Sequence, residues 1–156
     1  EGRTIAPYYV LEYPHWVHVV VVDAKKRILI TRQYRHGAKR IVAELLGGTM
    51  DKGDKNPLAA AKRELMEETG YSGNFMLAGI ASPNPATHTN NVYAYLVTRP
   101  IRKKVPKADP FEIMSYEFMP LSDVLTLIEK GEFVQAMHIG SLFLALRKGH
   151  MEMPVS

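Results

Sequence analysis

The sequence predicts an α+β fold, in which a mixed β-sheet lies between helices as an α/β/α sandwich. Short apolar segments typical of strands come before and after one central helix, and two further helices follow them. The composition is that of a globular protein, with 46% hydrophobic and 23% charged residues. At 156 residues we expect a single domain, residues 1–156, that is large enough to bury a core.

The predicted strands are short apolar runs bounded by turn residues. They are 17–22, 27–33, 41–46, 75–82, 92–97 and 111–120. Arg99-Pro100 is expected to end the strand over 92–97. Asp23-Ala24-Lys25-Lys26 predicts a hairpin turn between the first two. Segment 4–12 is expected to be extended, and Pro7 excludes it from the centre of a sheet.

The central helix has clear start and stop signals. Pro57 suits its first turn, either Asp54 or Asn56 can cap it, and Gly70 suits its end. Leu58, Ala61 and Leu65 are spaced to form one apolar stripe toward the core.

Two more helices are expected near the C-terminal end. One opens at 121–123 with Ser122 as its cap and reaches Lys130-Gly131. The other spans about 133–148 and carries apolar residues on every side, so we expect it to be buried in the core or in a subunit interface.

Three carboxylates share one face of the central helix, because Glu64, Glu67 and Glu68 are spaced i, i+3 and i+4. Each like-charge pair of this kind costs roughly 0.2–0.5 kcal/mol on an exposed helix. A hard divalent cation would reverse that effect, since Mg²⁺ and Mn²⁺ prefer oxygen ligands. The alternative is a solvated acidic face with Lys62 and Arg63 nearby.

The segment Arg63-Glu64-Leu65-Met66-Glu67-Glu68-Thr69-Gly70-Tyr71 resembles the second half of the Nudix box, R-E-U-x-E-E-x-G-U with U bulky and apolar, at every specified position. The first half departs from the family pattern of Gly, five residues, Glu, seven residues, Arg. Here Asp54 stands in place of the Glu, and eight residues separate it from Arg63. With residues 44–48 just before it, the chain is identified as a member of the Nudix family, which implies the Nudix α/β/α sandwich.

The resemblance implies a metal-dependent pyrophosphohydrolase. It would bind Mg²⁺, with Mn²⁺ as the substitute ion, through the carboxylates of Glu64, Glu67 and Glu68 and the carbonyl of Gly47. Arg63 would brace the box by pairing with Asp54 or Glu44. The base that accepts the water proton would be a box glutamate or Glu112, with Asp109 as the rival.

The segment 32–37 resembles the branch of the family that hydrolyses ADP-ribose and nucleotide sugars, and so does the Pro-Asn-Pro-Ala loop with Asn90-Asn91 behind it. Arg35 matches an arginine that contacts substrate phosphates, and its fork suits phosphate geometry. Trp16 is expected either to stack on a base or to pack. The residues expected to contact substrate are Trp16, Arg32, Arg35, Glu44 and Asn90. The products would be a nucleoside monophosphate and a sugar phosphate.

A homodimer is expected to complete the substrate site. Segment 4–12 is apolar and aromatic, Trp16 follows it, and the helix over 133–148 has apolar residues on every side. In the branch that the chain resembles, N-terminal strands are exchanged between subunits. We therefore expect residues 1–13 to reach the partner.

Three other functions were weighed: a nucleoside-triphosphate sanitising enzyme, a silent nucleotide-sensing Nudix domain and a nucleic-acid module. The net charge of +4 favours anionic partners, but the chain lacks the long basic helix of a nucleic-acid protein. None of the six histidines shows metal-ligand spacing. No apolar run is long enough to span a membrane, no signal peptide opens the sequence and cysteine is absent, so we expect a cytoplasmic protein.

Overall fold

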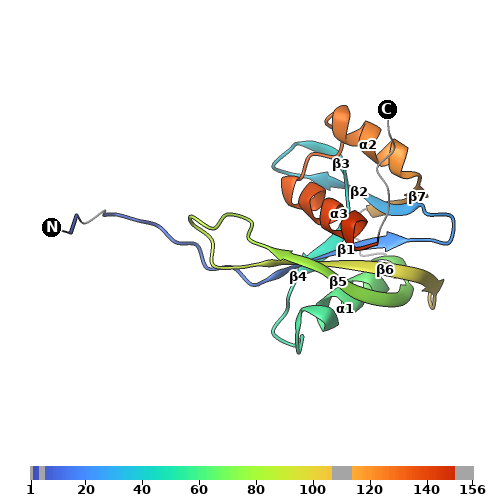
Figure 1. Cartoon of the computed structure of the whole chain (residues 1–156), viewed down its shortest axis with the longest axis horizontal. Coiled ribbons are helices and arrows are strands. Elements are labelled where there is room, and N and C mark those ends of the chain that lie inside the picture. The colour runs from blue at the N-terminus through green and yellow to red at the C-terminus, as the bar shows by residue number, and fades with distance from the viewer. Residues whose placement is uncertain (1, 4–5, 107–113, 150–156) are drawn as a thin grey trace.

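A computed structural model describes residues 2–3, 6–106 and 114–149. Figure 1 shows strands and helices in layers, with an N-terminal arm that projects from the body. In chain order the elements are β1 (Trp16–Val22), β2 (Ile28–Arg35), β3 (Arg40–Glu44), β4 (Leu46–Thr49), α1 (Pro57–Thr69), β5 (Tyr71–Ala81), β6 (Val92–Arg102), β7 (Met114–Met119), α2 (Leu121–Glu129) and α3 (Ala136–Lys148).

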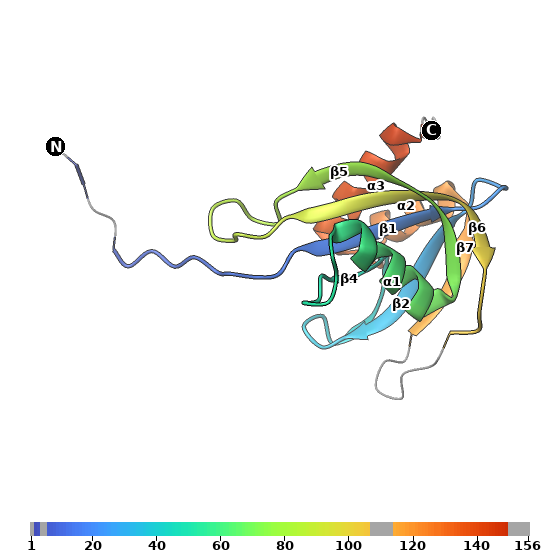
Figure 2. The same ribbon diagram turned by 90° about the horizontal axis from the view of Figure 1, so that it is seen from below.

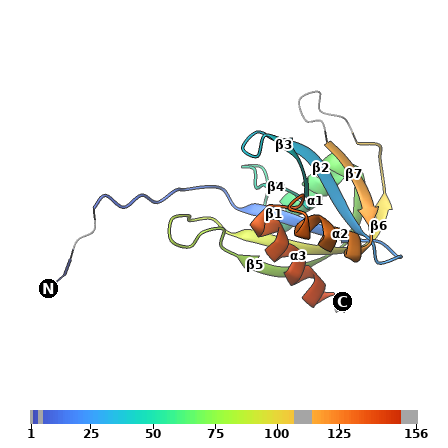
Figure 3. The same ribbon diagram turned by 90° about the horizontal axis from the view of Figure 1, so that it is seen from above.

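Strand β1 is the centre of the sheet. It pairs with β6 in parallel along its whole length and with β4 in antiparallel, while β5 lies antiparallel on the other side of β6. Strand β2 meets β1 only through the pair Val22 and Ile28, and it carries β3 and β7 as antiparallel neighbours. The strands therefore form two groups, which Figure 3 shows spreading apart from that junction.

The helices cover opposite faces of the group that contains β1. Helix α1 lies in front of the sheet in Figure 2 and helix α3 in front of it in Figure 3. Side chains alternate along β1, so Val17, Val19 and Val21 pack in the cluster of α1. Val20 and Val22 pack in the cluster of α3 and α2. This is the α/β/α sandwich with a mixed sheet that the sequence predicts.

The central helix begins and ends as predicted. Of the two proposed caps, Asn56 is the one used: its Oδ1 accepts a hydrogen bond from the Ala59 N–H at 2.9 Å. Gly70 ends the helix with a φ of 72°, the left-handed conformation that glycine adopts most easily. Ala61 and Leu65 are fully buried and Leu58 is partly buried.

The predicted cap of α2 is wrong. The helix begins at Leu121 after Pro120, whose backbone is extended and whose carbonyl accepts from the Asp123 and Val124 N–H groups. Ser122 lies inside the first turn and donates to the Asp123 carboxylate instead. Helix α3 begins at Ala136 rather than near residue 133.

Two strands differ from prediction for backbone reasons. The expected strand 41–46 is two strands, β3 and β4, which part at Leu45. Strand β6 continues through Arg99 and Pro100, which were expected to end it. Beyond Thr98, β6 no longer pairs with β1. Arg99 and Pro100 lie opposite Gly73 of β5, where the register shifts, and a proline is tolerated in such a bulge.

The N-terminal arm runs out along the 87–89 loop as an extended chain (Figures 1 and 2). The Leu11 N–H donates to the Thr87 carbonyl at 2.7 Å, and the Leu11 carbonyl accepts from the Thr89 N–H at 3.1 Å. Tyr8 and Tyr9 are 60% and 75% exposed. Among the described helices, none combines the length and the apolar character that a membrane crossing requires.

Candidate functional site

A cavity of about 740 Å³ opens where the two strand groups meet the helices. That volume lies within the range of small-molecule sites. Elements far apart in sequence line it, because β1, β2, β3 and β4 contribute together with α1 and the start of α3. The lining residues are Trp16, His18, Gln33, Arg35, Ala38, Val42, Glu44, Gly47, Gly48, Thr49, Glu64, Glu68, Val134, Gln135 and His138.

The two glycines of β4 allow helix α1 and strand β1 to come close. A Cβ at Gly48 would fall on the carboxylate of Glu64, so only glycine leaves room for that carboxylate in its present place. A Cβ at Gly47 would lie 2.6 Å from the Val17 carbonyl oxygen of β1. These glycines lie just past the end of the predicted strand 41–46, whereas in the structure they are part of strand β4, which shapes the cavity.

The three box glutamates have different surroundings. The carboxylates of Glu64 and Glu68 line the cavity, whereas Glu67 is exposed and accepts a hydrogen bond from Arg63 at 3.1 Å. Burial raises the pKa of Glu64, while the neighbouring Arg63 guanidinium acts to lower it. A buried carboxylate that keeps its charge needs a cationic partner, and Arg63 provides one at 2.9 Å.

The cavity offers oxygen donors of the kind that Mg²⁺ requires. Within the part of the chain that the structure describes, no three His, Cys, Asp or Glu side chains stand together as a complete metal cage. Mg²⁺ commonly takes one or two carboxylates and completes its shell with substrate phosphates and water. Glu64 and Glu68 beside the Gly47 backbone fit that pattern, and a role for Glu67 as a further ligand stays a prediction.

Arg63 holds the loop before the helix to the helix itself. Its guanidinium binds both Asp54 oxygens, at 3.3 and 2.9 Å, and the Thr49 carbonyl oxygen at 3.1 Å. The Arg63 hydrogen bonds keep the pKa of Asp54 below its ordinary value. Asp54 is therefore the bracing partner left open by the sequence, because Glu44 pairs elsewhere.

Glu44 binds Arg35. Both Nε and a terminal nitrogen of Arg35 donate to one Glu44 oxygen, at 2.9 and 2.6 Å. The Glu44 side chain is only 5% exposed, whereas that of Arg35 is 48% exposed. The buried carboxylate therefore holds the arginine in place, and the exposed part of the guanidinium can still meet an anion in the cavity.

Two histidines meet at the cavity, and no spacing in the sequence indicated them. The rings of His18 on β1 and His138 on α3 cross edge to face with centroids 4.1 Å apart. Burial lowers the pKa of His18 to about 4 and that of His138 well below its ordinary value, so both rings are neutral at pH 7. The one available signal was a histidine inside the apolar run of β1.

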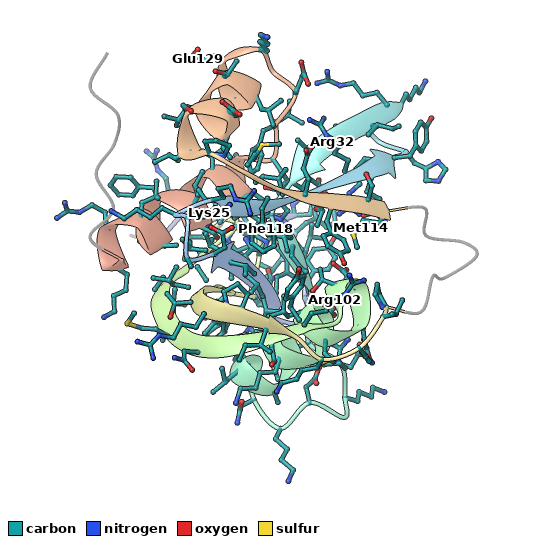
Figure 4. The ribbon with its side chains drawn as sticks, turned by 90° about the vertical axis from the view of Figure 1, so that its right-hand side faces the viewer. Lys25, Arg32, Arg102, Met114, Phe118 and Glu129 are labelled. Atoms are coloured by element: carbon teal, nitrogen blue, oxygen red, sulfur yellow. The ribbon has the colours of Figure 1, made fainter. Side chains whose placement is uncertain are left out.

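The remaining predicted site residues lie in different places. Trp16 lines the cavity, and Tyr13 of the arm packs near it with centroids 6.1 Å apart. Asn90 is buried outside the lining and donates to the Pro14 carbonyl at 3.1 Å, which ties the chain before β1 to the segment before β6. Arg32 lies beside β7, where it pairs with Glu117 at 3.4 Å (Figure 4). Glu112 and its rival Asp109 lie outside the described residues.

Comparison with known proteins gives a matching family model and distant relatives. The family model described as NUDIX domain matches residues 13–137. An ADP-ribose pyrophosphatase of Bacillus subtilis is 28% identical over 130 residues, which cover 81% of this chain and 69% of that protein. A methanol dehydrogenase activator of Bacillus methanolicus is 29% identical over 133 residues, covering 83% and 68%.

A solved structure has the same fold. The crystal structure of an ADP compounds hydrolase matches with a TM-score of 0.73 and covers 90% of this chain and 77% of its own. The sequence identity is 22%, so the likeness is one of fold.

Proposed function

Because the chain belongs to the Nudix family of hydrolases, we propose that it hydrolyses the pyrophosphate of a nucleoside diphosphate linked to a second group, with ADP-ribose or a nucleotide sugar as substrate. The observation that carries the proposal is the cavity in which Glu64, Glu68 and Arg35 meet. It combines carboxylates suited to a divalent cation with an arginine suited to phosphate.

The substrate class rests on two further arguments. Arg35 is placed by Glu44 so that part of its guanidinium remains exposed in a cavity large enough for a nucleotide. One relative, from Bacillus subtilis, carries the name ADP-ribose pyrophosphatase. A nucleoside-triphosphate sanitising enzyme would use the same glutamates and differ in the groups that meet the base and the second phosphate.

In this proposal Glu64, Glu68 and the Gly47 carbonyl would hold Mg²⁺ or Mn²⁺, with Glu67 as a further ligand. When bound, such an ion neutralises the diphosphate and lowers the pKa of a coordinated water. Arg63 pairs with the Glu64 carboxylate at 2.9 Å and opposes the rise in its pKa that burial causes. Arg35 binds a phosphate through charge-assisted hydrogen bonds.

The reaction needs one proton acceptor. Water adds to a phosphorus atom, the bond from that phosphorus to the bridging oxygen breaks, and either a box carboxylate or Glu112 accepts the water proton. The products are a nucleoside monophosphate and the phosphate of the second group, for example AMP and ribose 5-phosphate. Trp16 offers a flat surface on which a base could stack.

We further propose a homodimer in which residues 1–13 cross to the partner. The arm extends away from its own subunit, which Figure 1 shows, and exposes a run of large apolar residues, Tyr8, Tyr9, Val10 and Leu11. Exposed apolar segments of this kind mark interfaces. Tyr13 at the base of the arm packs near Trp16 of the same subunit, and Trp16 lines the cavity, so an interface formed by the arms would adjoin the site.

The test is turnover of a small substrate panel by the full chain in Mg²⁺: ADP-ribose, nucleotide sugars, dinucleoside polyphosphates, dNTPs and capped RNA. Glu68→Gln should keep the fold and remove nearly all turnover. Glu129→Gln, at an exposed position on α2 (Figure 4), removes the same charge outside the lining of the cavity and should retain wild-type rates. Wild-type rates in Glu68→Gln, or turnover of dNTPs alone, would refute the proposal.

A further inference from the structure

The ring of His138 is fixed by contacts on several sides. The Leu45 backbone N–H donates to its Nδ1 at 3.2 Å. The His18 ring packs against it edge to face with centroids 4.1 Å apart, and Phe133 lies 6.3 Å away by the same measure. His18 is itself held by Ser141, whose Oγ lies 2.8 Å from its Nδ1. The orientation of the His138 ring is therefore set before any ligand arrives.

The contact with Leu45 also sets the tautomer. A neutral imidazole has one donor and one acceptor nitrogen, and Nδ1 must accept because an N–H points at it. The proton then resides on Nε2. Among the described residues, none forms a hydrogen bond with Nε2. Nε2 is also not one of the fully buried side-chain atoms that lack a partner, so this atom is accessible. His138 lines the cavity and is otherwise buried, so its free edge faces the cavity.

The arginine and the histidine are positioned by consecutive residues. Glu44 holds Arg35 through its carboxylate, and Leu45 holds His138 through its N–H. Both groups line the same cavity and both present donors to it. A donor that faces the cavity and has no partner among the described residues is free to meet a ligand or a water there.

We propose that the Nε2–H of His138 donates a hydrogen bond to a phosphate oxygen of the bound diphosphate, beside the phosphate that Arg35 holds. The proposal rests on the proposed substrate class. Phosphate oxygens match this donor because they only accept hydrogen bonds, as Nε2–H only donates. Because the ring is neutral, it adds a directed contact without a second positive charge near Arg35. The ring therefore does not compete with Arg35 for the Glu44 carboxylate.

Two substitutions separate the donor from the structural contact. In His138→Asn, the side-chain oxygen can take the place of Nδ1 and still accept from Leu45, but no group replaces Nε2–H. In His138→Gln, the longer amide can place an N–H near the position of Nε2, while the contact with Leu45 is lost. Ser141→Ala serves as the matched control, since it loosens the same buried cluster through His18 and leaves the donor intact.

The measurement is the affinity for ADP-ribose in EDTA by calorimetry, together with kcat/KM in Mg²⁺ and the melting temperature of each variant. His138→Asn should bind ADP-ribose roughly 10- to 100-fold more weakly, the usual loss for a hydrogen bond to a charged group. His138→Gln should recover most of that affinity although it is the less stable protein. Ser141→Ala should lose stability only.

Several results would overturn the proposal. They are unchanged affinity in His138→Asn, equal weakening in both His138 variants, or a wild type that does not bind ADP-ribose. A wild type that binds ADP-ribose in EDTA but hydrolyses nothing would refute the proposed function alone. Should neither variant fold, the Nε2 signal of His138 in ¹⁵N-histidine-labelled wild type decides: it should shift on addition of ADP-ribose, and a fixed signal refutes the contact.

Discussion

A methyl group at position 48 would test whether the position of the Glu64 carboxylate matters for activity. In Gly48→Ala the new Cβ falls on that carboxylate, which is the end of a flexible side chain. The side chain can turn away without moving the backbone. We therefore expect the fold to survive and Glu64 to leave its place beside Gly48.

The size of the effect follows from the overlap. An ordinary contact of a Cβ is 3.4 Å or more, and the nearest Glu64 oxygen would have to move by more than an ångström to reach it. A misplacement of about 1 Å in a catalytic group can cost about 100-fold in rate. That loss corresponds to about 2.7 kcal/mol of transition-state stabilisation.

Gly47→Ala is the matched control for this prediction. Its Cβ would meet the Val17 carbonyl oxygen at 2.6 Å, and a strand backbone cannot turn away as a side chain does. Overpacking of this kind costs about 1–3 kcal/mol. For a chain of this size each kcal/mol lowers the melting temperature by roughly 2–4 °C. Gly47→Ala should therefore lose stability first.

The assay is kcat/KM on the substrate that the panel identifies, measured with the melting temperature of each variant. The expected pattern is a stable Gly48→Ala protein with about 1% of wild-type kcat/KM and a less stable Gly47→Ala protein. If Gly48→Ala keeps wild-type kcat/KM, the position of the Glu64 carboxylate does not matter for the reaction, and its assignment as a metal ligand is wrong.

Three other predictions concern the surroundings of the cavity. Arg35→Ala should lower kcat/KM roughly 10- to 100-fold through a lost phosphate contact, and Arg35→Ala/Glu44→Gln should regain stability without regaining activity, as unfolding and turnover would show. The pKa of Asp54 is lowered, so its ionised form stabilises the fold above about pH 4, and that contribution fades as the pH falls. Asp54→Asn should therefore flatten the acid side of the profile of melting temperature against pH, and an unchanged profile would contradict this. Deleting residues 1–13 should weaken dimerisation and substrate affinity together, whereas sedimentation of the active full chain as a micromolar monomer would exclude the dimer.

The central helix could be predicted from sequence because its signals are local. Asn56, Pro57 and Gly70 act within one turn of the backbone that they cap or end, so their effect does not depend on the rest of the fold. The common face of the box glutamates follows from helix periodicity in the same way. The sequence could not assign them different surroundings, since the burial of Glu64 depends on the distant strand β4.

The parts that sequence reasoning missed depend on contacts between distant segments. His18 and His138 meet because β1 and α3 pack together, and nothing in the spacing of the histidines indicates this. Strand β6 passes through Pro100 because a bulge opposite Gly73 accepts it, which local propensity cannot foresee. The expected hairpin at 23–26 did form, but it joins the two strand groups through one residue pair only.

Arg63 keeps a carboxylate partner although the first half of the box departs from the family pattern. Aspartate is one methylene shorter than the glutamate of the family pattern, and the segment from Asp54 to Arg63 is one residue longer. In the structure Asp54 still reaches Arg63 through both carboxylate oxygens and also accepts from the Asp51 N–H at 2.9 Å. The brace behind Glu64 is therefore retained despite both departures.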